Sequence, residues 1–79
     1  MKVSVKYFGV LAEKSNRSEE IIDLAETGRH LKEIKSFCAA KYGFTDLESI
    51  QLAVNEELAT DSELKDGDII AFLPPFAGG

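Results

Sequence analysis

Apolar and polar side chains alternate over residues 2–8, and this period of two predicts a β-strand with one face in water. The apolar positions of the strand are Val3, Val5 and Tyr7. Phe8 falls on the polar side, so it is either the last strand residue curling inward or an exposed aromatic. Strand character returns over residues 19–24, where the inward pair is Ile22 and Leu24. The two strands predict an antiparallel hairpin whose polar loop covers residues 13–18.

The hydrophobic period changes to three and four residues after this hairpin, which predicts one helix over residues 28–42. Its apolar stripe consists of Leu31, Ile34, Phe37, Cys38 and Tyr42. Thr27 is the expected N-cap, because its hydroxyl can accept a backbone N–H of the first turn. Gly43 stands where the residue after a helix takes a left-handed conformation.

Strand patterns occupy the rest of the chain up to residue 73. Residues 50–54 predict a third strand, which Asn55-Glu56-Glu57 turns toward a short fourth segment at Leu58-Ala59. Lys65-Asp66-Gly67-Asp68 predicts a tight turn with positive φ at its glycine. The continuous apolar run over residues 69–73 is typical of a strand covered on both faces, and therefore of a central strand.

The element order is β-β-α-β-(β)-β, which predicts an α+β fold with a mixed sheet of four to five strands. One main helix must cover one face of this sheet to bury both apolar surfaces. We place the first and last strands side by side and parallel in the centre, with a right-handed helical connection. This arrangement is a β-grasp, or ubiquitin-like, roll. We predict a β-grasp domain over residues 1–73 and a flexible C-terminal tail over residues 74–79.

Composition narrows the class of protein. A chain of 79 residues with 44% hydrophobic content builds one small domain. Its single cysteine, Cys38, excludes an internal disulfide or a multi-cysteine zinc site, which favours a cytoplasmic location. The net charge of −5 argues against nucleic-acid binding, and we expect no membrane segment because no apolar run approaches ~18 residues.

The tail is the most unusual segment of the sequence. Pro74 and Pro75 cannot continue a central strand, because they lack a backbone N–H. Phe76 follows, and after it come Ala77, Gly78 and Gly79, which have almost no side chain. Six extended residues reach roughly 20 Å, so the strip can carry an α-carboxylate into a slot too narrow for side chains. We interpret this carboxylate as the functional group.

The C-terminal segment resembles the MoaD family, the small subunits of molybdopterin synthase. The resemblance rests on Val54-Asn55, on Leu58 and on the last sixteen residues, which read Leu64-Lys65-Asp66-Gly67-Asp68-Ile69-Ile70-Ala71-Phe72-Leu73-Pro74-Pro75-Phe76-Ala77-Gly78-Gly79. A terminal Gly-Gly alone would be a weak signal. Its combination with Asp-Gly-Asp, an apolar strand and Pro-Pro is a strong one.

The resemblance implies a sulfur carrier. It implies that an E1-like (MoeB-like) adenylyltransferase consumes ATP to adenylate Gly79, which then becomes a thiocarboxylate. It further implies docking on a large (MoaE-like) subunit in a heterotetramer, where the tail, residues 74–79, donates sulfur to cyclic pyranopterin monophosphate and so forms the dithiolene of molybdopterin. No nucleotide-binding glycine-rich loop is present in the sequence, so we expect a non-catalytic sulfur-donor subunit with no tightly bound cofactor.

Matching positions in the family place the partner interface at Phe8, Leu58 and Leu73, around the root of the tail. The alternative is that these three side chains pack in the core of their own domain. Cys38 is expected to be a buried small hydrophobe, because it lies on the apolar stripe of the helix. His30 is expected to be a surface residue, because no second His or Cys stands at a spacing suitable for a metal.

Two further functions remain open. One is a related β-grasp carrier, either ThiS-like for thiazole synthesis or modifier-like, as in the ubiquitin-related and archaeal modifiers, for tRNA thiolation or protein conjugation. The other is a plain binding module, in which deletion of Gly78 and Gly79 would change nothing.

Overall fold

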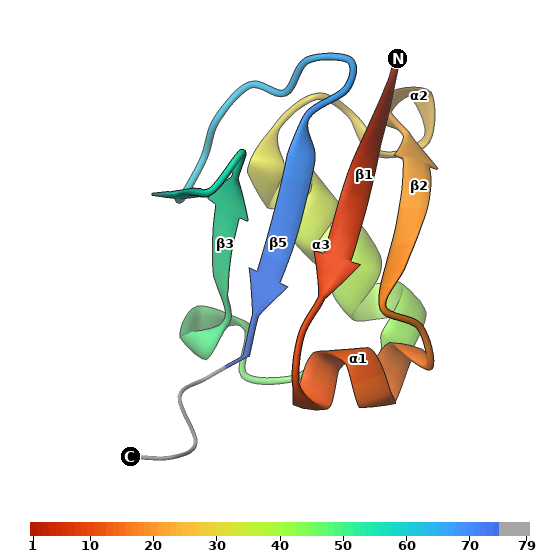
Figure 1. Ribbon diagram of the computed structural model, residues 1–79, viewed down its shortest axis with the longest axis vertical. Coiled ribbons are helices and arrows are strands. Elements are labelled where there is room, and N and C mark those ends of the chain that lie inside the picture. The colour runs from red at the N-terminus through yellow and green to blue at the C-terminus, as the bar shows by residue number, and fades with distance from the viewer. Residues whose placement is uncertain (75–79) are drawn as a thin grey trace.

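The computed structural model describes residues 1–74 and places five strands in one sheet of order β2-β1-β5-β3-β4. The strands are β1 (Lys2–Tyr7), β2 (Glu19–Asp23), β3 (Gln51–Val54), β4 (Glu57–Ala59) and β5 (Ile69–Leu73). The helices are α1 (Val10–Ser15), α2 (Leu24–Thr27), α3 (Leu31–Tyr42) and the 3₁₀ turn η1 (Leu47–Ser49). Figure 1 shows β5 and β1 side by side in the middle, with α3 crossing behind them.

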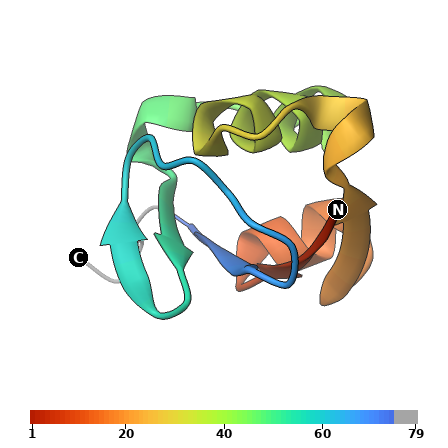
Figure 2. The ribbon, with the colours of Figure 1, turned by 90° about the horizontal axis from the view of Figure 1, so that it is seen from above.

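Pairing in the sheet is mixed. β1 runs parallel to β5, with Val5 opposite Ile70, and antiparallel to β2. β3 runs antiparallel to both β5 and β4. Seen from above, α2, α3 and η1 form one layer and the sheet the other, while α1 lies at the level of the sheet (Figure 2). The predicted β-grasp roll, with its first and last strands parallel and central, is confirmed.

The core lies between α3 and one face of the sheet. Every second residue of β1 and β5 points into it, as do the apolar residues of α3: Val3, Val5, Tyr7, Ile70, Phe72, Leu31, Ile34 and Cys38. The other face of β5 is not covered, since Ile69 remains 43% exposed. The prediction that this strand is covered on both faces is therefore wrong. Its apolar run reflects a core face and a second, open face that is also apolar.

Two local predictions about helices are also wrong. Helix α3 begins at Leu31 with His30 as its N-cap residue, whereas Thr27 ends the short helix α2. The Glu33 carboxylate accepts a hydrogen bond from the His30 backbone N–H at 3.1 Å, which satisfies one donor of the first turn. In place of a polar loop after residue 13, the chain forms α1, which Asn16 ends at φ 59°. Gly43 has φ 73°, so the predicted left-handed C-cap is confirmed.

The end of β5 opposite the tail is fastened by side-chain hydrogen bonds. Asn55 acts as an extra strand residue, because its Oδ1 accepts from the Ile69 N–H at 3.0 Å and its own N–H donates to the Ile69 carbonyl at 2.8 Å. Asp68 accepts from Asn55 Nδ2 at 3.1 Å and from the Lys65 N–H at 2.8 Å. These residues belong to the motif that carries the family resemblance, and in the structure they join β3 to the turn before β5.

Candidate functional site

The root of the tail lies where β5 leaves the centre of the sheet. Leu73 pairs with Gln51 of β3 and is partly buried. Pro74 lies against Gly9, close enough that a Cβ added to Gly9 would come within 3.0 Å of Pro74 Cγ. The remaining predicted tail residues lie outside the described part of the chain: Pro75, Phe76, Ala77, Gly78 and Gly79. The structure therefore fixes the point at which the tail departs.

An aromatic cluster anchors this root from the core side. The ring of Phe72, the penultimate residue of β5, is fully buried and lies 5.4 Å from the Tyr7 ring and 6.1 Å from the Phe44 ring. The Tyr42 ring stands edge-on to Tyr7 at 5.6 Å. Aromatic rings at such distances attract one another beyond the area they bury. Phe72 thus fixes the direction in which Leu73 and Pro74 emerge.

A polar cluster borders the aromatic one, and the sequence analysis missed it. Tyr7 and Tyr42 each donate a hydrogen bond to Glu20 Oε2 at 2.6 Å. Arg17 Nη1 and Lys41 Nζ each lie 3.2 Å from Glu20 Oε1. Burial raises the pKa of Glu20, but the hydrogen bonds from Tyr42, Tyr7 and Lys41 outweigh it and hold the pKa below its usual value. Glu20 is therefore a charged hub between β1, β2 and α3.

Cys38 completes this cluster from α3. Its side chain is fully buried, and its Sγ lies 3.2 Å from the Tyr7 hydroxyl. Because the Tyr7 proton goes to Glu20, the thiol proton is left to donate to the Tyr7 oxygen. Burial raises the pKa of Cys38 to about 11. The prediction of a buried small hydrophobe is confirmed, and at neutral pH this thiol is a poor nucleophile.

The three predicted interface residues share the open face of the sheet. Phe8 is 45% and Leu58 67% exposed, so neither packs in the core, and Leu73 is partly buried. Between them, Ala53 of β3 pairs with Leu58 of β4 and with Ala71 of β5, so the surface between the three predicted residues consists of small alanine side chains. Phe8 also lines a hollow of about 460 Å³ on this face together with Lys6, Asn55, Glu56, Ile69 and Ala71. Their role as an interface stays a prediction.

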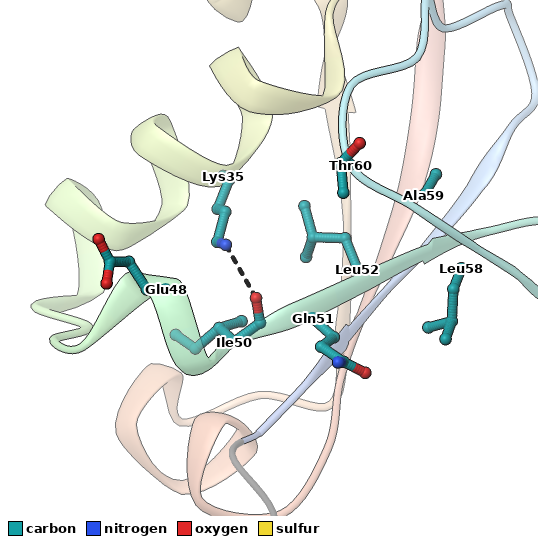
Figure 3. Close-up of a pocket in the computed structure, with 8 residues that line it drawn as sticks. All are labelled: Lys35, Glu48, Ile50, Gln51, Leu52, Leu58, Ala59 and Thr60. Atoms are coloured by element: carbon teal, nitrogen blue, oxygen red, sulfur yellow. Dashed lines mark hydrogen bonds between the residues drawn. The ribbon is translucent and has the colours of Figure 1, made fainter.

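A second hollow, of about 500 Å³, lies beside the edge strand β4 (Figure 3). Its lining comes from α3, η1, β3, β4 and the residues just before β3 and just after β4: Lys35, Glu48, Ile50, Gln51, Leu52, Leu58, Ala59 and Thr60. Lys35 Nζ donates to the Ile50 carbonyl at 2.8 Å. Figure 3 shows Leu52 and Leu58 extending to opposite sides of the sheet edge. Apolar surface is thus accessible within two strands of the root of the tail.

Within residues 1–74, no group of three or more His, Cys, Asp or Glu side chains is arranged to hold a metal ion. None of the helices in this part of the chain has the length and apolar character needed to span a membrane. His30, which was predicted to be a surface residue, is exposed at the start of α3 with Nδ1 3.5 Å from Glu33.

The fold and the position of the tail root define a ubiquitin-like β-grasp domain that carries a C-terminal extension from its central strand. The sequence model of the ThiS family matches residues 5–79 of this chain. The chain belongs to the ThiS family, which agrees with the resemblance to MoaD-type carriers.

Individual relatives extend this assignment. A molybdopterin synthase sulfur carrier subunit from Chlamydomonas reinhardtii is 29% identical, over the whole of both chains. A chain in the complex of subunits 1 and 2 of molybdopterin-converting factor from Helicobacter pylori is 32% identical, with all of both chains covered and a TM-score of 0.71. The small archaeal modifier protein SAMP1 from Haloferax volcanii also matches over both full chains, with a TM-score of 0.81 at 21% identity, which shows a common fold.

Proposed function

We propose that this chain is the sulfur carrier subunit of a molybdopterin synthase. The observation that carries the proposal is the tail root, where the central strand β5, flanked by β1 and β3, ends beside an exposed apolar face of the sheet. Beyond it, the sequence continues to Gly78-Gly79. The relatives from Chlamydomonas reinhardtii and Helicobacter pylori support this function over other uses of the same fold.

In the proposed reaction, the Gly79 carboxylate attacks the α-phosphorus of ATP on an E1-like (MoeB-like) partner and pyrophosphate leaves. A sulfur nucleophile then attacks the acyl adenylate and displaces AMP. Hydrosulfide as the nucleophile gives the Gly79 thiocarboxylate directly. A persulfide of a partner protein gives an acyl disulfide instead, and a second thiol then attacks its S–S bond, which releases the thiocarboxylate and leaves the partner as a disulfide. Activation is required because a carboxylate with a pKa of about 3.3–3.7 is ionised and is a poor electrophile at neutral pH.

Transfer follows in a complex with a large (MoaE-like) subunit, which we propose as a heterotetramer. The tail enters the active site of that subunit, where the thiocarboxylate sulfur attacks a side-chain carbon of cyclic pyranopterin monophosphate and a carbon–oxygen bond at that carbon breaks. Two such transfers supply both sulfurs of the dithiolene, and water returns Gly79 to its carboxylate each time. The carrier itself keeps no cofactor, and the catalytic groups lie on the large subunit.

The open face of the sheet is the proposed docking surface. Exposed apolar side chains at Phe8 and Leu58 can act as anchors beside the tail, with Leu73 at its base. Phe8→Ala should weaken binding of the large subunit about tenfold or more, as truncation of an anchor does. Ile21 is equally exposed on β2, further from the tail root, so Ile21→Ala is the matched control and should bind normally.

The test of the proposed function is the intact mass of the protein isolated from its own cells. A species in which one oxygen is replaced by sulfur supports a carrier. A branched isopeptide species would support the modifier alternative instead, and the absence of both would refute the proposal. Gly79→Ala should abolish or slow sulfur transfer without lowering the melting temperature, since that residue lies beyond the last strand.

A further inference from the structure

Strand β4 forms the edge of the sheet beyond β3 and has one hydrogen-bonding position open to solvent. Asn55 and Glu56 both have positive φ and join β3 to β4 in a two-residue turn. The pair that flanks such a turn, Val54 and Glu57, is hydrogen-bonded, so the next pair, Ala53 and Leu58, is not. Within β4, Leu58 is therefore the residue whose backbone N–H and C=O point away from β3.

The pairing of β3 with β5 supports this assignment independently. The Asn55 N–H donates to the Ile69 carbonyl, so alternation along β3 directs the backbone groups of Ala53 toward β5. They are accordingly not available to Leu58. Within residues 1–74, the N–H and C=O of Leu58 therefore have no strand partner. Such groups at the edge of a sheet are where an added strand makes its hydrogen bonds.

The apolar and charged side chains around Leu58 indicate which kind of strand could pair with this edge. The hollow of Figure 3 lies next to Leu58 and offers apolar surface mainly from Leu58, which is 67% exposed, and from the partly buried Ala59. Ile50 and Leu52 also line it, but their side chains are buried in the core. Glu48 lines the hollow, and further acidic residues lie next to its lining residues Leu58 to Thr60 in the sequence: Glu56, Glu57 and Asp61. Among the described residues, Asp61 has an ion-pair partner, Lys32 at 3.9 Å, and the three glutamates have none. The nearby ammonium of Lys35 already donates to a backbone carbonyl.

We propose that the large synthase subunit adds an extended strand to β4 at Leu58, and that this strand places an apolar side chain in the hollow with lysine or arginine beside it. The inference rests on the proposed function and specifies how the partner is recognised. β4 is favoured over β2, the other edge strand, because Leu58 lies in register with Ala71, two residues before Leu73. On β2, Ile21 is in register with Ser4 and Ile69, at the far end of β5.

Ile21 provides a close control for Leu58. It is 66% exposed on the same face, compared with 67% for Leu58, and it also lies on an edge strand. The Tyr7 N–H donates to the Ser18 carbonyl, so alternation along β2 leaves the Ile21 backbone groups pointing outward as well. The two positions share exposure, face and backbone direction and differ in their place relative to the tail.

The first experiment measures amide hydrogen exchange of the isotope-labelled carrier, free and in complex with the purified large subunit. The Leu58 amide should exchange rapidly in the free chain and at least about tenfold more slowly in the complex, while the Ile21 amide is unchanged. If the complex forms and transfers sulfur but the Leu58 amide stays unprotected, the inference is wrong and the proposed function stands. Protection of Leu58 in the free chain that grows with concentration would identify a second copy as the occupant, which also refutes the inference.

The second experiment separates the backbone from the side chain by measuring affinity for the large subunit. Leu58→Ala removes side-chain contact but keeps the N–H, and Leu58→Pro removes the N–H at a position where an edge strand tolerates proline. Leu58→Pro should bind about fivefold more weakly than Leu58→Ala, while Ile21→Ala and Ile21→Pro stay within about twofold of the wild type. Equal affinities of the two Leu58 variants, with both folded by melting curve, would overturn the inference. Failure of the wild type to bind the large subunit would overturn the proposed function as well.

Discussion

Replacing Glu20 by glutamine removes one negative charge from the cluster beside the tail root and changes the side-chain volume little. The Glu20 side chain is 7% exposed, and one of its oxygens accepts hydrogen bonds from both Tyr7 and Tyr42 at 2.6 Å. A carboxylate is an acceptor at both oxygens. An amide supplies one acceptor and one donor, so its NH₂ group must face either the two tyrosine hydroxyls or the cations of Arg17 and Lys41.

The expected loss of stability follows from these contacts. Hydrogen bonds to a charged acceptor contribute about 1.5–3 kcal/mol each and neutral ones about 0.5–1.5 kcal/mol, so the two tyrosine bonds together lose about 2–3 kcal/mol. Arg17 and Lys41 are nearly half exposed and add at most about 1 kcal/mol. For a domain of this size, a total of about 2–4 kcal/mol lowers the melting temperature by roughly 10–30 °C.

The assay is thermal and urea unfolding of the wild type and of Glu20→Gln over a range of pH. The folded-state pKa of Glu20 is lowered, so its contribution is fully present above the unfolded pKa of about 4.3 and is lost as the pH falls through the folded value. The difference in stability should therefore be constant near neutral pH and shrink in acid. Glu19→Gln, an exposed neighbour on β2, is the control and should change stability by less than about 0.5 kcal/mol. A difference below that limit at neutral pH, or one that persists undiminished in strong acid, would refute the reasoning.

Three further predictions concern the same domain. Cys38 should resist thiol-modifying reagents in the native protein near pH 7 and react on unfolding, because its pKa is raised to about 11; rapid native labelling would contradict its burial. Tyr42→Phe should cost about 1–2 kcal/mol in urea unfolding, since it removes one donor from the charged Glu20, and an unchanged midpoint would argue against that bond. Asn55→Gly keeps the positive φ but loses the side-chain bonds to Asp68 and Ile69; it should lower stability by about 1–2 kcal/mol and leave sulfur loading of Gly79 unaffected, which intact mass measures.

The fold could be predicted because its signals are periodic and long enough to be unambiguous. β1 alternates over its whole length, and α3 repeats its apolar stripe over three turns. Helix α1 was missed because six residues with one buried leucine, Leu11, offer no repeat. Thr27 is a suitable N-cap by residue type. However, Gly28 has φ 98°, which is not a helical conformation, so α3 begins only at Leu31.

The site was predictable only where it is contiguous in the sequence. The tail was identified from adjacent residues, whereas the hub at Glu20 joins positions from β1, β2 and α3 that only the fold brings together. One signal was available, because a buried tyrosine such as Tyr7 needs a partner for its hydroxyl. The apolar run of β5 could not reveal that one face stays open, since hydrophobicity alone does not distinguish a second core face from a surface such as that around Ile69.

The placement of β5 between β1 and β3 has a mechanical consequence. A pull on Leu73 along the strand axis loads the hydrogen bonds to both neighbours in shear, so that they resist together instead of opening one after another like a zipper. Because β1 is parallel to β5, tension between the two ends of the chain acts along the same rows of bonds. A force that a partner applies to the tail must therefore break the hydrogen bonds on both sides of β5 together before this strand is displaced from the sheet.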